Sequence, residues 1–162
     1  MKKIACLIVS FLILCNAQNS FSLKVKSGDN ELDMDLNEMN VRAKADIKLF
    51  NTEIKAAYNV TDNTLDNLYV KYKMEPADVY MALELGSITG KPVVEIANVY
   101  SVKKDKGWGV IAKELGIKPG SPEFHRLKNN AKKHKKGKDK EDKDEDKHHE
   151  HPGKGKGKGK NK

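Results

Sequence analysis

The chain has very little cysteine. Its 162 residues include only Cys6 and Cys15, and none follows position 15. Disulfide bonds, thiol catalysis and thiolate zinc sites are therefore excluded from everything beyond the N-terminal segment. Histidine is also scarce before the C-terminal tail, because residues 23–128 contain only His125. A solitary histidine on a helix is usually a surface or packing residue, so His125 is not assigned a catalytic role.

The sequence also lacks the local motifs by which many enzymes are detected. No serine stands in a nucleophile-elbow setting, no glycine-rich phosphate loop follows an expected strand, and no HExxH occurs. The carboxylates show no pairing beyond one stripe in residues 29–35. We therefore predict a protein that is not an enzyme, and we assign no catalytic and no cofactor-binding residue.

Long hydrophobic runs are limited to the first residues. Two lysines precede IACLIVSFLIL (4–14), an 11-residue run that would span about 16 Å as a helix, too short for a hydrocarbon core of about 30 Å. Small residues follow, so the pattern is typical of a secretory signal peptide over residues 1–22, cleaved after Ala17 or Ser22. This predicts a secreted or periplasmic bacterial protein with no transmembrane span in the mature chain.

The segment LILC (12–15) raises lipidation as an alternative, with Cys15 as the lipid-anchored first residue. A lipobox needs a small residue just before the cysteine, whereas Leu14 occupies that position. The sequence therefore favours a plain cleaved signal over a lipid anchor at Cys15.

Residues 23–60 alternate in hydropathy as strands do. In MNVRAKADIKL (39–49) every odd position is apolar and every even position is polar, and LDMDL (32–36) alternates in the same way. A helix would scatter those apolar residues around its circumference. The pattern therefore predicts an antiparallel meander of three to four strands with one buried face.

The charges of this segment fit the same meander. Carboxylates on one strand would face basic residues on the next, which predicts ion pairs between Asp29, Glu31, Asp33 and Asp35 and the set Arg42, Lys44 and Lys48. A calcium loop is an alternative use of these carboxylates. The EF-hand type needs Gly at its sixth position and Glu at its twelfth, where Met34 and Asn40 stand. A solvated strand face is therefore favoured.

Residues 61–128 have helical periodicity instead. Apolar residues recur at helical spacing in five short segments: 64–74, 77–85, 92–104, 108–115 and 122–133. ALELGSITGKP (82–92) and AKELGIKPGSP (112–122) share a pattern in which Gly86 or Gly116 ends a helix and a proline begins the next. This predicts paired helical hairpins. The predicted fold class is α+β, with strands over 23–60 and helices over 61–128 in one small domain.

The stretch WGVIAKELGIKPGSPEFHRLK (108–128) also resembles half of a DNA-binding helix-turn-helix. Pro122 and Glu123 occupy the first turn of its second helix, where recognition helices present base-reading side chains. Residues 23–128 carry no net charge, so the basic face that DNA binding needs is absent. The sequence favours a packed corner between two helices over cytoplasmic DNA recognition, with Trp108 as a core anchor at a helix start.

The order of these parts resembles a group of uncharacterised secreted bacterial proteins. They combine a signal, a strand-rich half, the block GWGVIAKELGIKPGSPEFH (107–125) and a Lys/Gly-rich tail. The resemblance implies residence outside the bacterial cytoplasm. That group has no known activity, so the resemblance implies no catalytic residue.

Residues 129–162 contain no hydrophobic residue after Ala131, and they carry 13 Lys against 7 Asp plus Glu. A segment that cannot bury apolar surface is predicted to be disordered. Its lysines suit a polyanionic partner such as lipopolysaccharide, anionic lipid, a wall polymer or extracellular nucleic acid. The predicted polyanion contacts are Lys132, Lys133, Lys135, Lys136, Lys154, Lys156, Lys158 and Lys160.

A group of histidines offers the same tail a different ligand. Closely spaced imidazoles chelate zinc, nickel or copper, which makes His148, His149 and His151 the candidate metal ligands. Neighbouring lysines repel a cation, and nothing in the sequence preorganises the ligands. Three alternatives therefore stay open for the tail: polyanion binding, transition-metal binding, and a solubilising role without a specific ligand.

Overall fold

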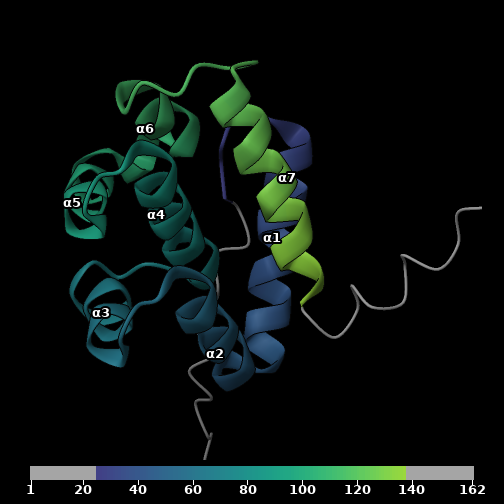
Figure 1. Ribbon diagram of the computed structural model, residues 1–162, viewed down its shortest axis with the longest axis vertical. Coiled ribbons are helices and arrows are strands. Elements are labelled where there is room, and N and C mark those ends of the chain that lie inside the picture. Colours follow the sequence, from purple (N-terminus) through teal and green to yellow (C-terminus); the bar gives the residue numbers. More distant parts are fainter. Residues whose placement is uncertain (1–24, 138–162) are drawn as a thin grey trace, which may run out of the picture.

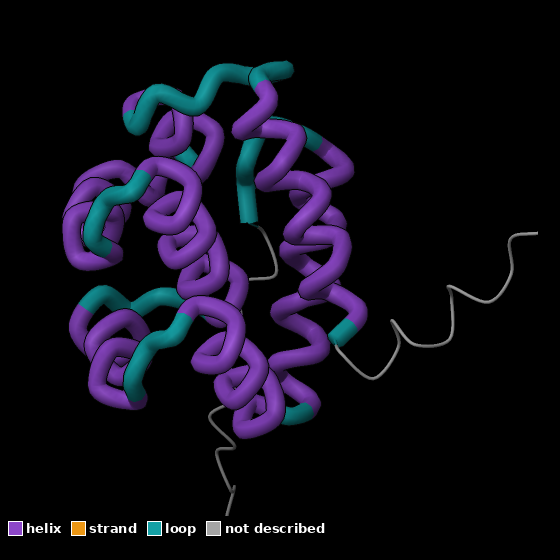
Figure 2. Tube along the Cα trace, in the orientation of Figure 1, coloured by secondary structure: helices purple, strands orange, loops and turns teal. Residues whose placement is uncertain are grey.

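Figure 1 shows a computed structural model of the chain, which describes residues 25–137. All regular structure in this range is helical (Figure 2). The elements are α1 (Asn30–Ala45), α2 (Ile47–Tyr58), α3 (Asp62–Asp66), the π-helical turn η1 (Asn67–Lys71), α4 (Pro76–Thr89), α5 (Val93–Lys103), the 3-10 turn η2 (Lys104–Lys106), α6 (Trp108–Glu114) and α7 (Pro122–Lys136). No strand occurs between residues 25 and 137, so the predicted β-meander and the α+β fold class are wrong.

The segment predicted to form strands instead forms α1 and α2. The buried residues of α1 recur every three or four positions: Leu32, Asp35, Leu36, Met39, Asn40 and Ala43. This is the period of a helix, but two of the six residues are polar, so hydropathy alone does not reveal it. Three of the apolar residues that produced the alternation are exposed, at 57%, 43% and 44%: Val41, Ile47 and Leu49.

Asp46 divides the alternating stretch into two helices. Its backbone N–H donates to the carbonyl of Arg42 at the end of α1 (3.1 Å), and its carboxylate accepts from the N–H of Leu49 in α2 (2.9 Å). Asp29 caps α1 in the same way by accepting from the N–H of Leu32 (2.9 Å). Such caps stabilise a helix by about 1 kcal/mol. The alternation over 39–49 therefore spans one helix end and one helix start.

α4 is the central helix of the domain. Every residue from Pro76 to Gly86 is buried, and α1, α2, α5 and α7 pack around it. A helix that is covered on all sides has no polar face. Fully burying a leucine or methionine side chain contributes about 1.5–3 kcal/mol, and Met81 and Leu85 of α4 are both completely buried.

The five helical segments expected in residues 61–128 are present, with shifted ends. Gly116 ends α6 at φ +92°, and the N–H of Ile117 donates to the carbonyl of Ala112 (2.9 Å), which confirms the predicted stop there. The stop predicted at Gly86 is wrong. α4 continues for another turn, and Gly90 takes the left-handed cap at φ +71°.

α7 is longer than predicted and has different neighbours. It extends to Lys136, so residues 129–136 are helical although the sequence predicted disorder from 129 onward. It packs along α1 and against α4 instead of forming a hairpin with α6 (Figure 1). Leu127 and Ala131 supply its buried side. The predicted signal peptide (1–22), Cys15 and the tail from residue 138 lie outside the described range.

Candidate functional site

Ion pairs join α7 to the acidic side of α1: Lys128–Asp29, Lys128–Glu31, Lys132–Glu31, Lys135–Asp35 and Lys135–Glu38. The Nζ of Lys135 lies 2.6 Å from Asp35 Oδ1, on a side chain that is only 5% exposed. A buried carboxylate without a partner is costly, so Lys135 contributes to holding the two helices together. Lys132 and Lys135, both predicted to contact a polyanion, therefore already have partners inside the fold.

These pairs replace the cross-strand pairs expected from the sequence. Arg42 binds Glu53 of α2 (2.6 Å) and not a carboxylate of the second predicted strand. Asp33 accepts from both the N–H and the Oγ–H of Ser27 (2.6 Å each), which fixes the chain entering α1. The predicted cross-strand pairing is wrong because the described residues contain no strands: the carboxylates and Arg42 belong to α1 or its N-cap, and the partners of Asp33, Asp35 and Arg42 come from residue 27, α7 and α2.

The same contacts shift the pKa values of the groups involved. The pKa of Lys128 is raised by its hydrogen bonds to Glu31 and Asp29. The pKa of Glu31 is lowered, chiefly by the Lys128 hydrogen bond, and that of Asp29 is lowered first by the backbone N–H of Leu32. Asp35 and then Glu38 raise the pKa of Lys135. Each shift favours the charged form, so the ion pairs persist over a wide pH range.

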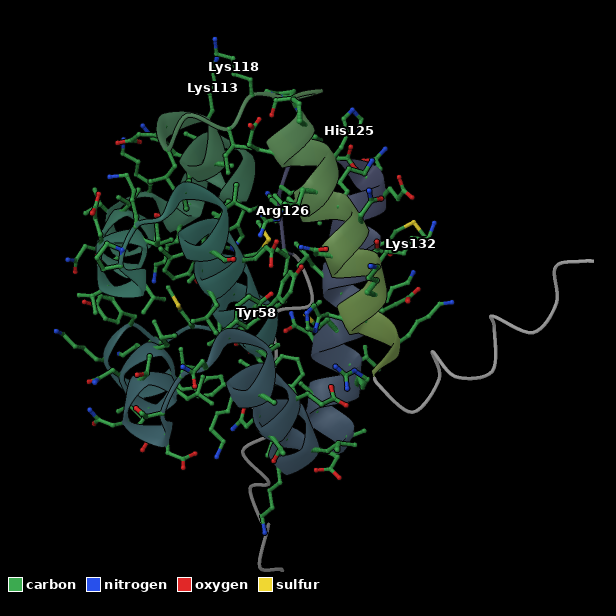
Figure 3. The ribbon with its side chains drawn as sticks, viewed as in Figure 1. Tyr58, Lys113, Lys118, His125, Arg126 and Lys132 are labelled. Carbon is green, nitrogen blue, oxygen red and sulfur yellow. The ribbon has the colours of Figure 1, made fainter. Side chains whose placement is uncertain are left out.

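α7 carries exposed cationic side chains in addition to the lysines already described. Lys133 is exposed and has no ion-pair or hydrogen-bond partner among residues 25–137. Lys136, the last residue of α7, is also exposed. His125 and Lys132 lie along the same helix, with Lys113 and Lys118 near its N-terminal end (Figure 3). The last turn of α7 is followed by Gly137 and the lysine-rich sequence, and we call Lys132, Lys133, Lys135 and Lys136 the cationic end of α7, within which Lys132 and Lys135 also pair with α1.

The predicted metal ligands belong to the C-terminal tail. His148, His149 and His151, like Lys154, Lys156, Lys158 and Lys160, lie outside the described residues. Within residues 25–137 no group of three or more His, Asp or Glu side chains could hold a metal ion. No helix in the same range combines the length and apolar character that crossing a bilayer requires.

A buried polar cluster that no sequence motif indicates lies between α2, α4 and α7. Glu84 is 2% exposed and accepts hydrogen bonds from Tyr58 Oη (2.7 Å) and Asn130 Nδ2 (2.7 Å). The His134 ring stacks on Tyr58 at 5.8 Å and lies 5.3 Å from the ring of Tyr80. Burial raises the pKa of Tyr58, which keeps its phenol protonated as a donor. Tyr58 thus reaches the space between α4 and α7 (Figure 3).

Trp108 begins α6 and is 2% exposed, which confirms its prediction as a core anchor. Its Nε1–H donates to Asp78 Oδ1 (2.7 Å), and Tyr100 Oη donates to Asp78 Oδ2 (2.8 Å). The two rings stack at 5.0 Å. Burial and then the Asp78 charge raise the pKa of Tyr100, so its phenol also stays a donor. Asp78 therefore acts structurally, as the acceptor that orients both rings.

The glycines on either side of Trp108 allow another chain segment to approach. A Cβ on Gly109 would lie 2.0 Å from the carbonyl oxygen of Ser27, and one on Gly107 would lie 2.5 Å from that of Lys26. The N–H of Trp108 donates to the same Lys26 carbonyl (2.6 Å). The motif GWG is thus the docking point of the segment that leads into α1.

Comparisons with known proteins do not extend this description. No family model matches the chain, and no curated protein or solved structure is significantly similar to it. The resemblance to secreted bacterial proteins, based on residues 107–125, therefore stays a prediction.

Proposed function

We propose that this is a non-enzymatic, secreted or envelope-associated bacterial protein that binds polyanionic surfaces or polymers through the cationic end of α7 and the residues that follow it. The observation that carries the proposal is the attachment of α7. α7 is packed on α1 and α4 as far as its last turn, where Lys135 pairs with Asp35, and that turn contains Lys133, His134, Lys135 and Lys136. The lysine-rich sequence thus begins at a folded support.

The charge distribution supports different roles for the lysines of α7 and for those of residues 154–160. The lysines nearest the domain pair with α1, whereas the sequence from 154 to 160 alternates lysine and glycine without any acidic residue. A lysine near an anionic surface contributes about 1 kcal/mol, and several act together. The signal pattern of residues 1–22 supports export to a compartment where such surfaces are available.

The proposal is tested by the salt dependence of binding to polyphosphate and to lipopolysaccharide vesicles. In the full-length chain, Lys154, Lys156, Lys158 and Lys160 are changed together to Gln. The slope of log K against log salt concentration should become shallower by about 3, given about 0.7 for each phosphate contact. The matched control changes four exposed lysines of the domain to Gln: Lys48, Lys106, Lys113 and Lys118.

The two variants remove the same charge, so their comparison separates a site from general attraction. The control should retain the slope of the unmodified protein. An equal decrease of the salt slope in both variants would mean that only net charge matters. An unchanged slope in the tail variant would refute the proposal.

Metal binding is the alternative function of the same sequence, favoured by three histidines within residues 148–151. It predicts stoichiometric zinc or nickel binding that is lost when His148, His149 and His151 become Ala. Polyanion binding, in contrast, should survive EDTA. Stoichiometric metal binding without polyanion binding would replace the first function with the second.

A further inference from the structure

A cavity of about 570 Å³ opens between the start of α4, the end of α5 and the start of α6. Trp108 and Tyr100, both buried, form part of its wall, and Val25 and Ile111 add apolar surface. Asp78 also lines it, but both of its oxygens already accept hydrogen bonds. The cavity thus combines an apolar wall with charged groups, and ligand sites generally pair apolar surface with a few polar groups in this way.

Three lysines from separate segments line the same cavity: Lys26 before α1, Lys73 before α4 and Lys104 after α5. All three are exposed, and their ammonium groups have no hydrogen-bond or ion-pair partner between residues 25 and 137. Glu75 and Asp105 line the cavity as well, and neither forms an ion pair with these lysines. Burial and the neighbouring Asp78 raise the pKa of Glu75. The cavity therefore presents charges of both signs that do not neutralise one another by direct contact.

The backbone at Lys73 is left-handed just after η1, where the N–H of Met74 donates to the carbonyl of Leu68 (3.1 Å). Lys73 has φ +52°, a left-handed conformation that side chains other than Gly, Asn and Asp rarely adopt. The other such non-glycine residue in the described range is Asn59, a type that tolerates this conformation. Local strain of this kind concentrates at ligand sites. Here the strained residue is one whose charged side chain lines the cavity.

We propose that this cavity binds a zwitterionic small molecule, namely an amino acid or a short peptide with free amino and carboxyl groups. Lys26, Lys73 and Lys104 would hold the carboxylate, and Glu75 and Asp105 would hold the ammonium group. A ligand that is only anionic would face two carboxylates, and one that is only cationic would face three lysines. The apolar wall of Val25, Trp108 and Ile111 accommodates an aliphatic side chain.

The test uses the full-length protein and matched ligands. Trp108 is the only tryptophan, so its indole N–H resonance and its fluorescence report directly on the cavity. The probes are L-valine and L-alanyl-L-alanine, which distinguish a free amino acid from a peptide. N-acetyl-L-valine removes the positive charge, and L-valinamide removes the negative one. We expect saturable binding of at least one zwitterion and a loss of about tenfold or more with each blocked form of valine.

Single substitutions test whether the zwitterion binds in this cavity. Lys73→Gln and Glu75→Gln should each weaken zwitterion binding about tenfold, whereas Lys113→Gln, on an exposed site of α6 outside the cavity, should not change it. Equal binding of valine and N-acetyl-L-valine, or no binding of either zwitterion up to about 10 mM, would overturn the proposal. The variant lacking Lys154, Lys156, Lys158 and Lys160 should bind zwitterions normally, so this proposal and the polyanion function can fail independently.

Discussion

Lys135 of α7 lies 2.6 Å from Asp35 of α1, a carboxylate that is 5% exposed in the interface between the two helices. The same ammonium group reaches Glu38 at 3.1 Å. The sequence assigns Lys135 to a solvated cationic tail, yet the structure uses it to neutralise a charge inside the domain. The boundary between domain and tail therefore cannot be drawn from lysine content.

Replacing Lys135 should destabilise the domain. Lys135→Met leaves Asp35 buried without its cation, and breaking such a pair on one side costs about 3 kcal/mol, reduced here because the lysine is partly exposed. Urea denaturation measures the change. Lys133→Met, two positions away on the exposed side, should change stability by less than about 0.5 kcal/mol. Equal effects of the two substitutions would contradict the role assigned to Lys135.

The contribution of the α1–α7 ion pairs to the free energy of unfolding should be constant over a middle range of pH and smaller on both sides of it. The pKa values of Lys128 and Lys135 are raised above the ordinary 10.5, so their contribution is complete below that value and is lost as pH rises through the raised pKa. Those of Asp29 and Glu31 are lowered below 3.8 and 4.5, so their contribution is complete above these values and is lost as pH falls through the lowered pKa.

Urea midpoints measured across pH for the unmodified protein and for Lys128→Gln isolate this effect. Buried tyrosines, whose pKa values are also raised, weaken both proteins at high pH and cancel in the difference. The difference should be largest between about pH 5 and 10 and should shrink on both sides. A difference that is the same at every pH would show that Lys128 contributes by packing alone.

Removing the Asp78 carboxylate, which accepts a hydrogen bond from Trp108, should lower the free energy of unfolding. Asp78→Ala leaves the Trp108 indole N–H and the Tyr100 hydroxyl buried without partners, at about 1–3 kcal/mol each. We expect a loss of at least about 2 kcal/mol, with red-shifted emission from the single tryptophan. Asp78→Asn keeps one acceptor oxygen and should lose less. Asp66→Ala, at an exposed site, serves as the control.

The helices of the second half could be predicted because apolar residues recur in them at helical spacing and because Pro76, Pro122 and Gly116 mark helix ends. Gly116 and Trp108 behave as their sequence context suggests. The first half could not be predicted in this way because Asp35 and Asn40 occupy buried helical positions. Asn40 Oδ1 accepts from the N–H of Ala77 (2.8 Å), a partner 37 residues away that no local pattern reveals.

The candidate site could be predicted only in part, because it too depends on contacts between residues that are distant in the sequence. The lysines of residues 132–136 are visible as a cationic cluster, but composition does not tell which of them face α1. Which lysines face α1 depends on the angular position of each residue around α7 and on the acidic residues of α1. The cavity near Trp108 gave no signal, because Lys26, Lys73 and Lys104 are widely separated in the sequence and meet only through the packing of α4, α5 and α6.

Gly109 offers a test in which local and tertiary effects oppose each other. Gly109→Ala lies inside α6, where helix propensity alone predicts a gain of about 1 kcal/mol. Its Cβ would lie 2.0 Å from the Ser27 carbonyl, so the entering segment must move. We expect a net loss of about 2 kcal/mol and faster tryptic cleavage after Lys26. Val110→Ala, on the exposed side of α6, should not accelerate cleavage. A stabilised Gly109→Ala protein would contradict the observed docking.

Lys73 should show opposite effects on stability and on binding. Its left-handed backbone costs a residue other than glycine about 1 kcal/mol, so Lys73→Gly should stabilise the protein by about 0.5–1 kcal/mol. Lys73→Ala removes the same charge but keeps the strain, so its stability should not increase. Both variants should bind valine more weakly than the unmodified protein. Thermal unfolding and valine titration of the pair separate the two effects. If Lys73→Gly gains stability without losing affinity, the strain belongs to the turn before α4 and the lysine side chain does not contribute to the cavity.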